Sequence, residues 1–213
     1  MVVKARHPVK VNRRVPGLFQ ATYRRHAIHV GEIAVAWNAL QSGLFQVFWA
    51  LVSPDNHAVA FGLWHCIQSD KTQREMLLAV AKAALSEGRM RRNVEWMCAK
   101  AELISPHRND AAHTPISVYF GSTAGFSVIP NPMSTRTPAY QRLSAEPTDK
   151  LWRRVRGDLI ALTNYAVTIA AEIREIGPLV PSPRRPRLLW KAASARKRSS
   201  PPAKARRGRP PKS

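Results

Sequence analysis

The residues of this chain best suited to chemistry are an arginine and a histidine that stand close together in a polar stretch. Asn109 follows Arg108 directly, and His113 comes after four intervening residues in the run Arg108-Asn109-Asp110-Ala111-Ala112-His113. A guanidinium group binds a phosphate and stabilises charge that develops on it, whereas an imidazole transfers protons near neutral pH. Arg108, Asn109 and His113 are therefore a candidate catalytic site that needs no metal ion to act on a phosphodiester.

The same residues also have a purely structural interpretation. Arg108 can pair with Asp110 or Glu102 on a helix surface, and His113 can bind the carbonyl groups at a helix C-terminus. In one continuous helix, positions five apart point about 140° away from each other. A site that uses both side chains then needs either an irregular turn, which Asn109 and Asp110 can hold through local hydrogen bonds, or a second copy of the chain.

The elements that must position these residues are mostly helices. Apolar residues recur at helical spacing, which predicts an all-α bundle of about five helices, at roughly 30–52, 56–68, 70–87, 89–104 and 149–176. Pro106 either starts a short helix over 107–113 or continues a kinked one. A glycine-bounded turn at 121–125 between apolar runs predicts a small β-hairpin before the last helix, and 131–147 reads as a loop.

Positive charge is concentrated at the two ends of this chain of net charge +21. Residues 1–28 carry seven lysines and arginines, residues 178–213 carry twelve, and neither end has an acid, so the middle holds fifteen basic residues against thirteen acids. We expect a largely disordered basic arm over 1–28, a helical domain over 29–177 and a disordered basic tail over 178–213. Such polycationic ends favour nucleic acid as the partner, with an anionic membrane surface as the alternative.

The tail ends in a short motif that resembles the AT-hook. In such a motif the glycine lets the backbone enter the narrow minor groove of A·T-rich DNA, and the flanking arginines lie along the groove floor. The alternative is a polycation without sequence preference, and only a preference for A·T-rich DNA separates the two. The candidate DNA-binding residues are Arg206, Arg207, Gly208, Arg209, Pro210 and Lys212.

Other classes of protein are disfavoured by the composition. The two cysteines, Cys66 and Cys98, are far apart and argue for buried reduced thiols rather than a disulfide scaffold. Neither a Cys/His cluster nor a phosphate-binding loop is recognisable, so we expect no metal and no cofactor. The most apolar segment, 33–52, is interrupted by polar residues, which argues against a membrane span and for a cytoplasmic protein, with association with the nucleoid through its basic ends as an alternative.

The chain resembles the HEPN class of helical domains (higher eukaryote and prokaryote nucleotide-binding domains). The resemblance rests on Arg108-Asn109 and His113 late in a helical bundle and covers about 29–176. It extends to a subgroup of small bacterial helical proteins through short motifs in other helices, namely Trp37-Asn38, Ser69-Asp70, Gln73-Arg74 and His113-Thr114.

This resemblance implies a homodimer in which paired motifs form a metal-independent ribonuclease site. His113 would transfer protons at a ribose 2′-hydroxyl or a leaving oxygen, Arg108 would bind the phosphate, and Asn109 would orient either group. Many members of the class only bind ligands or partners. Two further interpretations therefore stand beside the ribonuclease: a DNA-binding accessory protein that acts through its tail, and an inactive module that binds another protein, such as an antitoxin-like partner.

Overall fold

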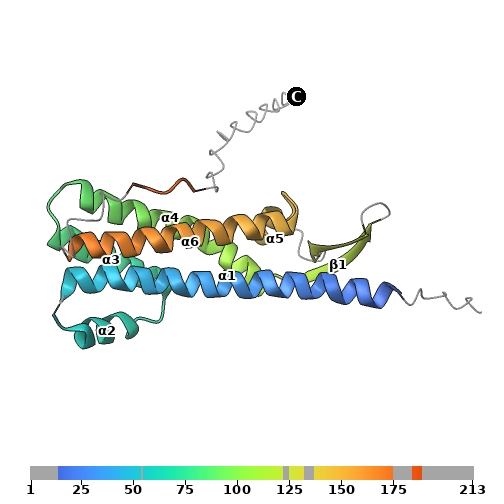
Figure 1. Ribbon diagram of the computed structural model, residues 1–213, viewed down its shortest axis with the longest axis horizontal. Coiled ribbons are helices and arrows are strands. Elements are labelled where there is room, and N and C mark those ends of the chain that lie inside the picture. The colour runs from blue at the N-terminus through green and yellow to red at the C-terminus, as the bar shows by residue number, and fades with distance from the viewer. Residues whose placement is uncertain (1–13, 54, 122–124, 132–136, 175–183, 189–213) are drawn as a thin grey trace, which may run out of the picture.

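The computed structural model describes residues 14–53, 55–121, 125–131, 137–174 and 184–188. Within them, six helices and a two-stranded hairpin form an elongated bundle (Figure 1). The antiparallel strands place Gly121 opposite Gly125. The expected mostly helical fold, with a hairpin before the last long helix, is confirmed. The elements are α1 (Arg14–Val52), α2 (His57–His65), α3 (Asp70–Ala84), α4 (Arg89–His113), β1 (Ile116–Gly121), β2 (Gly125–Pro130), α5 (Pro138–Leu143) and α6 (Thr148–Ile173).

The two longest helices, α1 and α6, lie side by side and run in the same direction (Figure 1). Near their N-terminal ends His26 packs against Trp152, and near their C-terminal ends Arg174 binds Gln46. A Cβ atom on Gly43 would lie 3.0 Å from the Cβ of Ala166, so a glycine at this position allows the two helices to approach closely. Helix α4 runs in the opposite direction, since Arg89 at its start pairs with Glu172 at the end of α6.

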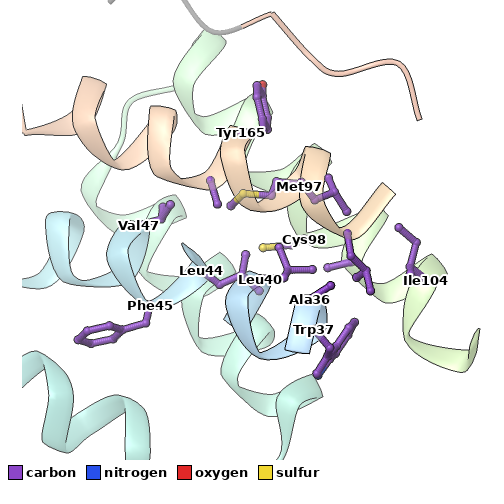
Figure 2. Close-up of a cluster of buried hydrophobic side chains, with 14 of the residues drawn as sticks. Ala36, Trp37, Leu40, Leu44, Phe45, Val47, Met97, Cys98, Ile104 and Tyr165 are labelled. Carbon is purple, nitrogen blue, oxygen red and sulfur yellow. The ribbon is translucent and has the colours of Figure 1, made fainter. Parts of the chain in front are cut away.

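The hydrophobic core lies between α1, α6 and α4, with α3 covering its side. Figure 2 shows Leu40 and Leu44 of α1 beside Cys98 of α4 in the buried cluster, to which Trp37 and Met97 also belong. Within the described residues, the apolar stripes that the sequence indicated on 30–52 and 149–176 are the inward faces of α1 and α6. Burial raises the pKa of the Cys98 thiol to about 12, so that this cysteine behaves as a small apolar residue. Cys66, which we expected to be buried, is exposed.

Helix α1 begins at Arg14 rather than near residue 30, so the expectation of a disordered arm is wrong for residues 14–28. Long-range packing explains the difference. Phe19 meets Phe126 of the hairpin edge-on, with ring centroids 6.3 Å apart, and His26 is buried beside α6. Residues 1–13 and 189–213, where the remaining basic segments fall, lie outside the described residues.

The segment before the last helix also differs from expectation. It was predicted to be a loop, yet it contains α5, a helix of six residues that Thr137 caps by accepting a hydrogen bond from the backbone N–H of Tyr140. Farther along, the hydroxyl of Thr148 donates to the carbonyl of Val128 and so joins the start of α6 to the hairpin. Helix α5 also packs against the end of α4, because its Arg142 binds Asp110 there.

Helix α4 continues through Pro106 to His113 without a break. A proline inside a helix removes one backbone hydrogen bond, here the bond that would reach the carbonyl of Glu102. Burial on both sides of the proline compensates, because Ile104 and His107 are each only 2 % exposed. Of the two alternatives that the sequence left open, continuation of the helix through Pro106 is therefore confirmed, whereas a separate short helix over 107–113 and an end near residue 104 are wrong.

Candidate functional site around Arg108

Arg108 projects from α4 onto a tryptophan of the core. Its guanidinium carbon lies 5.6 Å from the centroid of the Trp37 ring, and Nη2 lies 3.9 Å from Oδ2 of Asp70. Its Nη1 donates a hydrogen bond of 2.9 Å to Oδ1 of the adjacent Asn109. The Arg108 side chain is still 33 % exposed, so its position is restricted while solvent, or an anion, can reach it.

Helix α3 supplies the rest of this environment. Asp70 is its first residue, directly after the N-cap Ser69, and it accepts a hydrogen bond of 2.9 Å from the indole Nε1 of Trp37. One turn later, the buried Arg74 lies 5.9 Å from the same indole ring and pairs with Glu102 of α4. The Trp37 indole therefore contacts a carboxylate and two guanidinium groups that come from α3 and α4.

Several residues that carried the family resemblance thus converge in space. Trp37 and Asp70 contact Arg108, and Arg74 contacts the same Trp37 ring, although all three lie far from Arg108 in sequence. Gln73, next to Arg74, donates to the backbone carbonyls of Trp64 and Ile67 and so connects the end of α2 to α3. Asn38, by contrast, is exposed on α1. The short motifs of the separate helices therefore describe one supporting shell for Arg108, with Asn38 outside it.

His113 is not part of this shell. It is the last residue of α4 and is exposed. Because α4 is continuous, His113 lies about 7.5 Å farther along the axis than Arg108 and points about 140° away from it. The irregular turn that would bring the two side chains together is absent from α4, so one chain does not unite them. Only the pairing of two chains remains as a way to form a joint site.

Asp110, in the middle of the motif, has a structural role. Its two carboxylate oxygens each accept a hydrogen bond of 2.7 Å from Arg142 of α5, and its side chain is 4 % exposed. The hydrogen bond to Asp110 is the main reason why the pKa of Arg142 is raised. Asp110 therefore joins α4 to α5 instead of holding an irregular turn beside Asn109, as the sequence had suggested.

The neighbouring histidine, His107, is also structural. It is 2 % exposed and faces the same α4–α5 junction. Desolvation is the largest cause of its lowered pKa, with Asp110 opposing the shift and Arg142 and Arg154 reinforcing it. A histidine buried in this way stays neutral at physiological pH, whereas His113 meets solvent. This difference in burial makes His113 the histidine that a substrate can reach.

Removing the Asp110 carboxylate should destabilise the fold. Asp110→Ala is expected to lower the free energy of unfolding by about 2 kcal/mol, because Arg142 loses its buried bidentate partner. Asn109→Ala, a change at the exposed neighbouring position, is expected to cost less than about 0.5 kcal/mol. Urea denaturation of both variants measures the difference, and equal losses would contradict a structural role for the Asp110–Arg142 pair.

A cavity in the described part of the chain lies away from this motif. It has a volume of about 600 Å³ and is enclosed by the N-terminal part of α1, strand β2, α5 and the start of α6. Its walls include Phe126, Val128 and Leu143, with Arg25 and Asp149 among the polar residues. Neither Arg108 nor His113 lines it. The motif is therefore a surface site, which suits a polymer substrate better than a small enclosed molecule.

Three further predictions concern the tail motif, metal binding and membrane spans. The AT-hook-like residues from Arg206 to Lys212 lie outside the described residues. Among the described residues, no group of three or more histidine, cysteine or acidic side chains is arranged to hold a metal ion. No helix of the described chain is both long enough and apolar enough to cross a bilayer.

Arg142 is the residue of this region that the sequence did not indicate. The signal that could have found it is Thr137-Pro138, an N-cap residue followed by a proline at the first helical position. Comparison of the chain with protein-family models, with curated proteins and with solved structures finds no match. The argument about function therefore depends on the residues themselves.

Proposed function

We propose that this chain is a HEPN-like nucleic-acid-binding protein in which two copies combine their motifs into a metal-independent ribonuclease site. The observation that best supports this function is the environment of Arg108. A guanidinium that Trp37 and Asp70 hold in place, yet that remains one third exposed, is suited to binding a phosphate group. The polycationic ends of the chain, which attract RNA, support the same proposal.

In this function the three motif residues have separate tasks. Arg108 binds the scissile phosphate and stabilises the charge that grows on its oxygens. Asn109 accepts the hydrogen bond from Arg108 and so orients the guanidinium. His113 removes the proton of a ribose 2′-hydroxyl or donates one to the leaving oxygen. Asp70 competes with the phosphate for Arg108, but the 3.9 Å separation makes that competition weak.

The shared site can be tested by mixing two inactive variants. An Arg108→Ala chain keeps His113, and a His113→Ala chain keeps Arg108. If Arg108 of one copy works with His113 of the other, a heterodimer of the two variants contains one intact site. With equal co-expression, about half of the dimers are mixed and each has one of two sites, so RNA cleavage should recover to about a quarter of the wild-type rate.

The measurement is cleavage of a structured RNA in the presence of EDTA, with each variant alone as the control. A wild-type chain that does not cleave would contradict the enzyme. An active wild-type chain whose co-expressed variants stay silent would contradict a site shared between two copies. A double variant, Arg108→Ala with His113→Ala, co-expressed with wild type should not restore activity beyond that of the wild-type dimers.

A second candidate function is favoured by the distribution of charge. The twelve basic residues and complete absence of acids after residue 177 suit a DNA-binding accessory protein, in which the bundle only connects two tails. Full-length protein with higher affinity for A·T-rich than for G·C-rich duplexes, and no RNA cleavage, would favour this function. Equal affinity for both duplexes would contradict an AT-hook.

A further inference from the structure

A short segment of the basic tail lies against the bundle. Residues 184–188 pass beside the first half of α4 (Figure 1). The Nε of Arg185 donates a hydrogen bond of 3.3 Å to Oδ1 of Asn93, and its Nη2 donates one of 3.1 Å to the carbonyl oxygen of Arg92. Leu188 is partly buried against the core cluster. We had expected the whole of 178–213 to be disordered, so this docked segment is a correction.

Aromatic rings complete the binding site for Arg185. Its guanidinium carbon lies 5.5 Å from the centroid of the Trp96 ring. Tyr165 of α6 packs edge-on against the same ring, with centroids 5.4 Å apart and planes at 82°. The arginine is therefore recognised through its donors and through its cationic face together. An arginine in this position holds the tail at one place on α4.

The docked segment directs its other arginines outward. Arg184 and Arg187 are both exposed, and Arg185 also remains exposed although it contacts α4. Docking therefore presents two positive charges of the tail at fixed places next to α4.

The face of α4 beside this segment is itself basic. Arg89, Arg92, Trp96 and Lys100 follow one another at spacings of three, four and four, so they form one stripe along the helix. The Lys100 ammonium lies 5.9 Å from the Trp96 ring. Of the acids nearby, Glu172 pairs with Arg89, whereas Glu87 and Glu95 pair with Arg91, which lies outside this stripe.

We propose that the α4 stripe and the docked tail segment together form a composite surface that binds the backbone of a single-stranded nucleic acid. Arg92, Lys100, Arg184 and Arg187 contact phosphates, and the partly exposed Trp96 lies among them. Arg185 acts as a positioning residue, because it keeps the tail beside the stripe. Cationic side chains around an aromatic ring are the chemistry that single strands favour. This inference depends on the nucleic-acid binding of the proposed function and not on cleavage.

The surface can be tested through the salt dependence of binding. The probe is a single-stranded oligodeoxythymidylate, which lacks the 2′-hydroxyl that cleavage requires. For the full chain, Arg92→Ala and Lys100→Ala should each make the slope of log K against log salt less steep by about 0.7, the value for one lost single-strand phosphate contact. Lys82→Ala, which removes the same charge from an exposed position on α3, should leave the slope unchanged.

The role of Arg185 requires a double-mutant cycle. If Arg185 aligns the tail with the stripe, Arg185→Ala should weaken binding about tenfold, and adding Arg92→Ala should then cost less than about twofold. As a second readout, trypsin should cleave the Arg187–Leu188 bond faster in Arg185→Ala than in wild type, relative to the Lys204–Ala205 bond of the same chain. Arg184→Ala is the matched control, and it should leave that ratio unchanged.

Each outcome separates this inference from the proposed function. If the full chain binds neither the oligodeoxythymidylate nor RNA, both the nucleic-acid binding and the surface are wrong. If it binds but the α4 variants have the same slope as the Lys82 control, the composite surface alone is wrong. Additive losses in the cycle, with unchanged trypsin cleavage, would show that Arg185 does not position the tail.

Discussion

Replacing His113 with alanine should abolish metal-independent RNA cleavage while leaving the fold intact. A positioned general acid or base accounts for about 10²- to 10⁴-fold of a rate, so the loss should be at least about a hundredfold. The fold should survive because His113 is the exposed last residue of α4, and Thr114 follows it as the C-cap through its own backbone N–H. The measurement is the rate of cleavage of a structured RNA in EDTA, with thermal unfolding by circular dichroism alongside.

A matched control for this prediction is His65→Ala. His65 is also an exposed histidine at the last position of a helix, α2, and its ring packs against Phe45 and Phe61. The His65→Ala chain should cleave RNA at the wild-type rate. Equal inactivity of the wild-type and His113→Ala chains would rule out the ribonuclease, and equal activity would assign the cleavage to other residues.

Ending the chain at Gly177 should weaken nucleic-acid binding by about a hundredfold at physiological salt. The change removes twelve basic residues and no acid, and the remaining helical domain is nearly neutral apart from the N-terminal segment. Each lost phosphate contact also flattens the salt dependence, by about 0.9 for duplex DNA. Fluorescence anisotropy with duplexes at several salt concentrations measures both quantities.

Two comparisons sharpen this second prediction. Arg207→Ala with Arg209→Ala should remove a preference for A·T-rich duplexes while leaving most of the affinity for mixed sequences. A chain ending at Leu188 keeps the docked segment and should bind single strands better than the chain ending at Gly177. Unchanged affinity after removal of the whole tail would place nucleic-acid binding elsewhere or exclude it.

The features that sequence could predict are those with a local or periodic signal. The apolar stripes of α1 and α6 repeat over many turns, and the glycines at 121 and 125 mark the hairpin, so both were found. The residue types of Arg108 and His113 indicated a candidate site, and Trp37 and Asp70 belong to short motifs that the sequence also indicated. The contacts that Arg108 and Asp70 both make with Trp37 are tertiary, and spacing alone does not encode them.

The features that escaped prediction depend on partners distant in the chain. The first turns of α1 have the composition of a disordered arm, but Phe19 and His26 find partners on the hairpin and on α6. Helix α5 is too short for a periodic signal. The docked tail segment is an extended stretch whose order comes from Arg185 and its contacts on α4, so its composition indicated only disorder.

The parallel arrangement of α1 and α6 determines the minimum length of a nucleic acid that contacts both basic ends of the chain. Because the two helices point the same way, the described chain starts at one end of the bundle and α6 finishes at the other (Figure 1). Helix α1 starts at Arg14, and Arg174 at the end of α6 lies beside Gln46, so the two ends are 32 residues of α1, or about 48 Å, apart. A duplex that contacts the described chain at both ends must extend over about 14 base pairs, at about 3.4 Å for each pair.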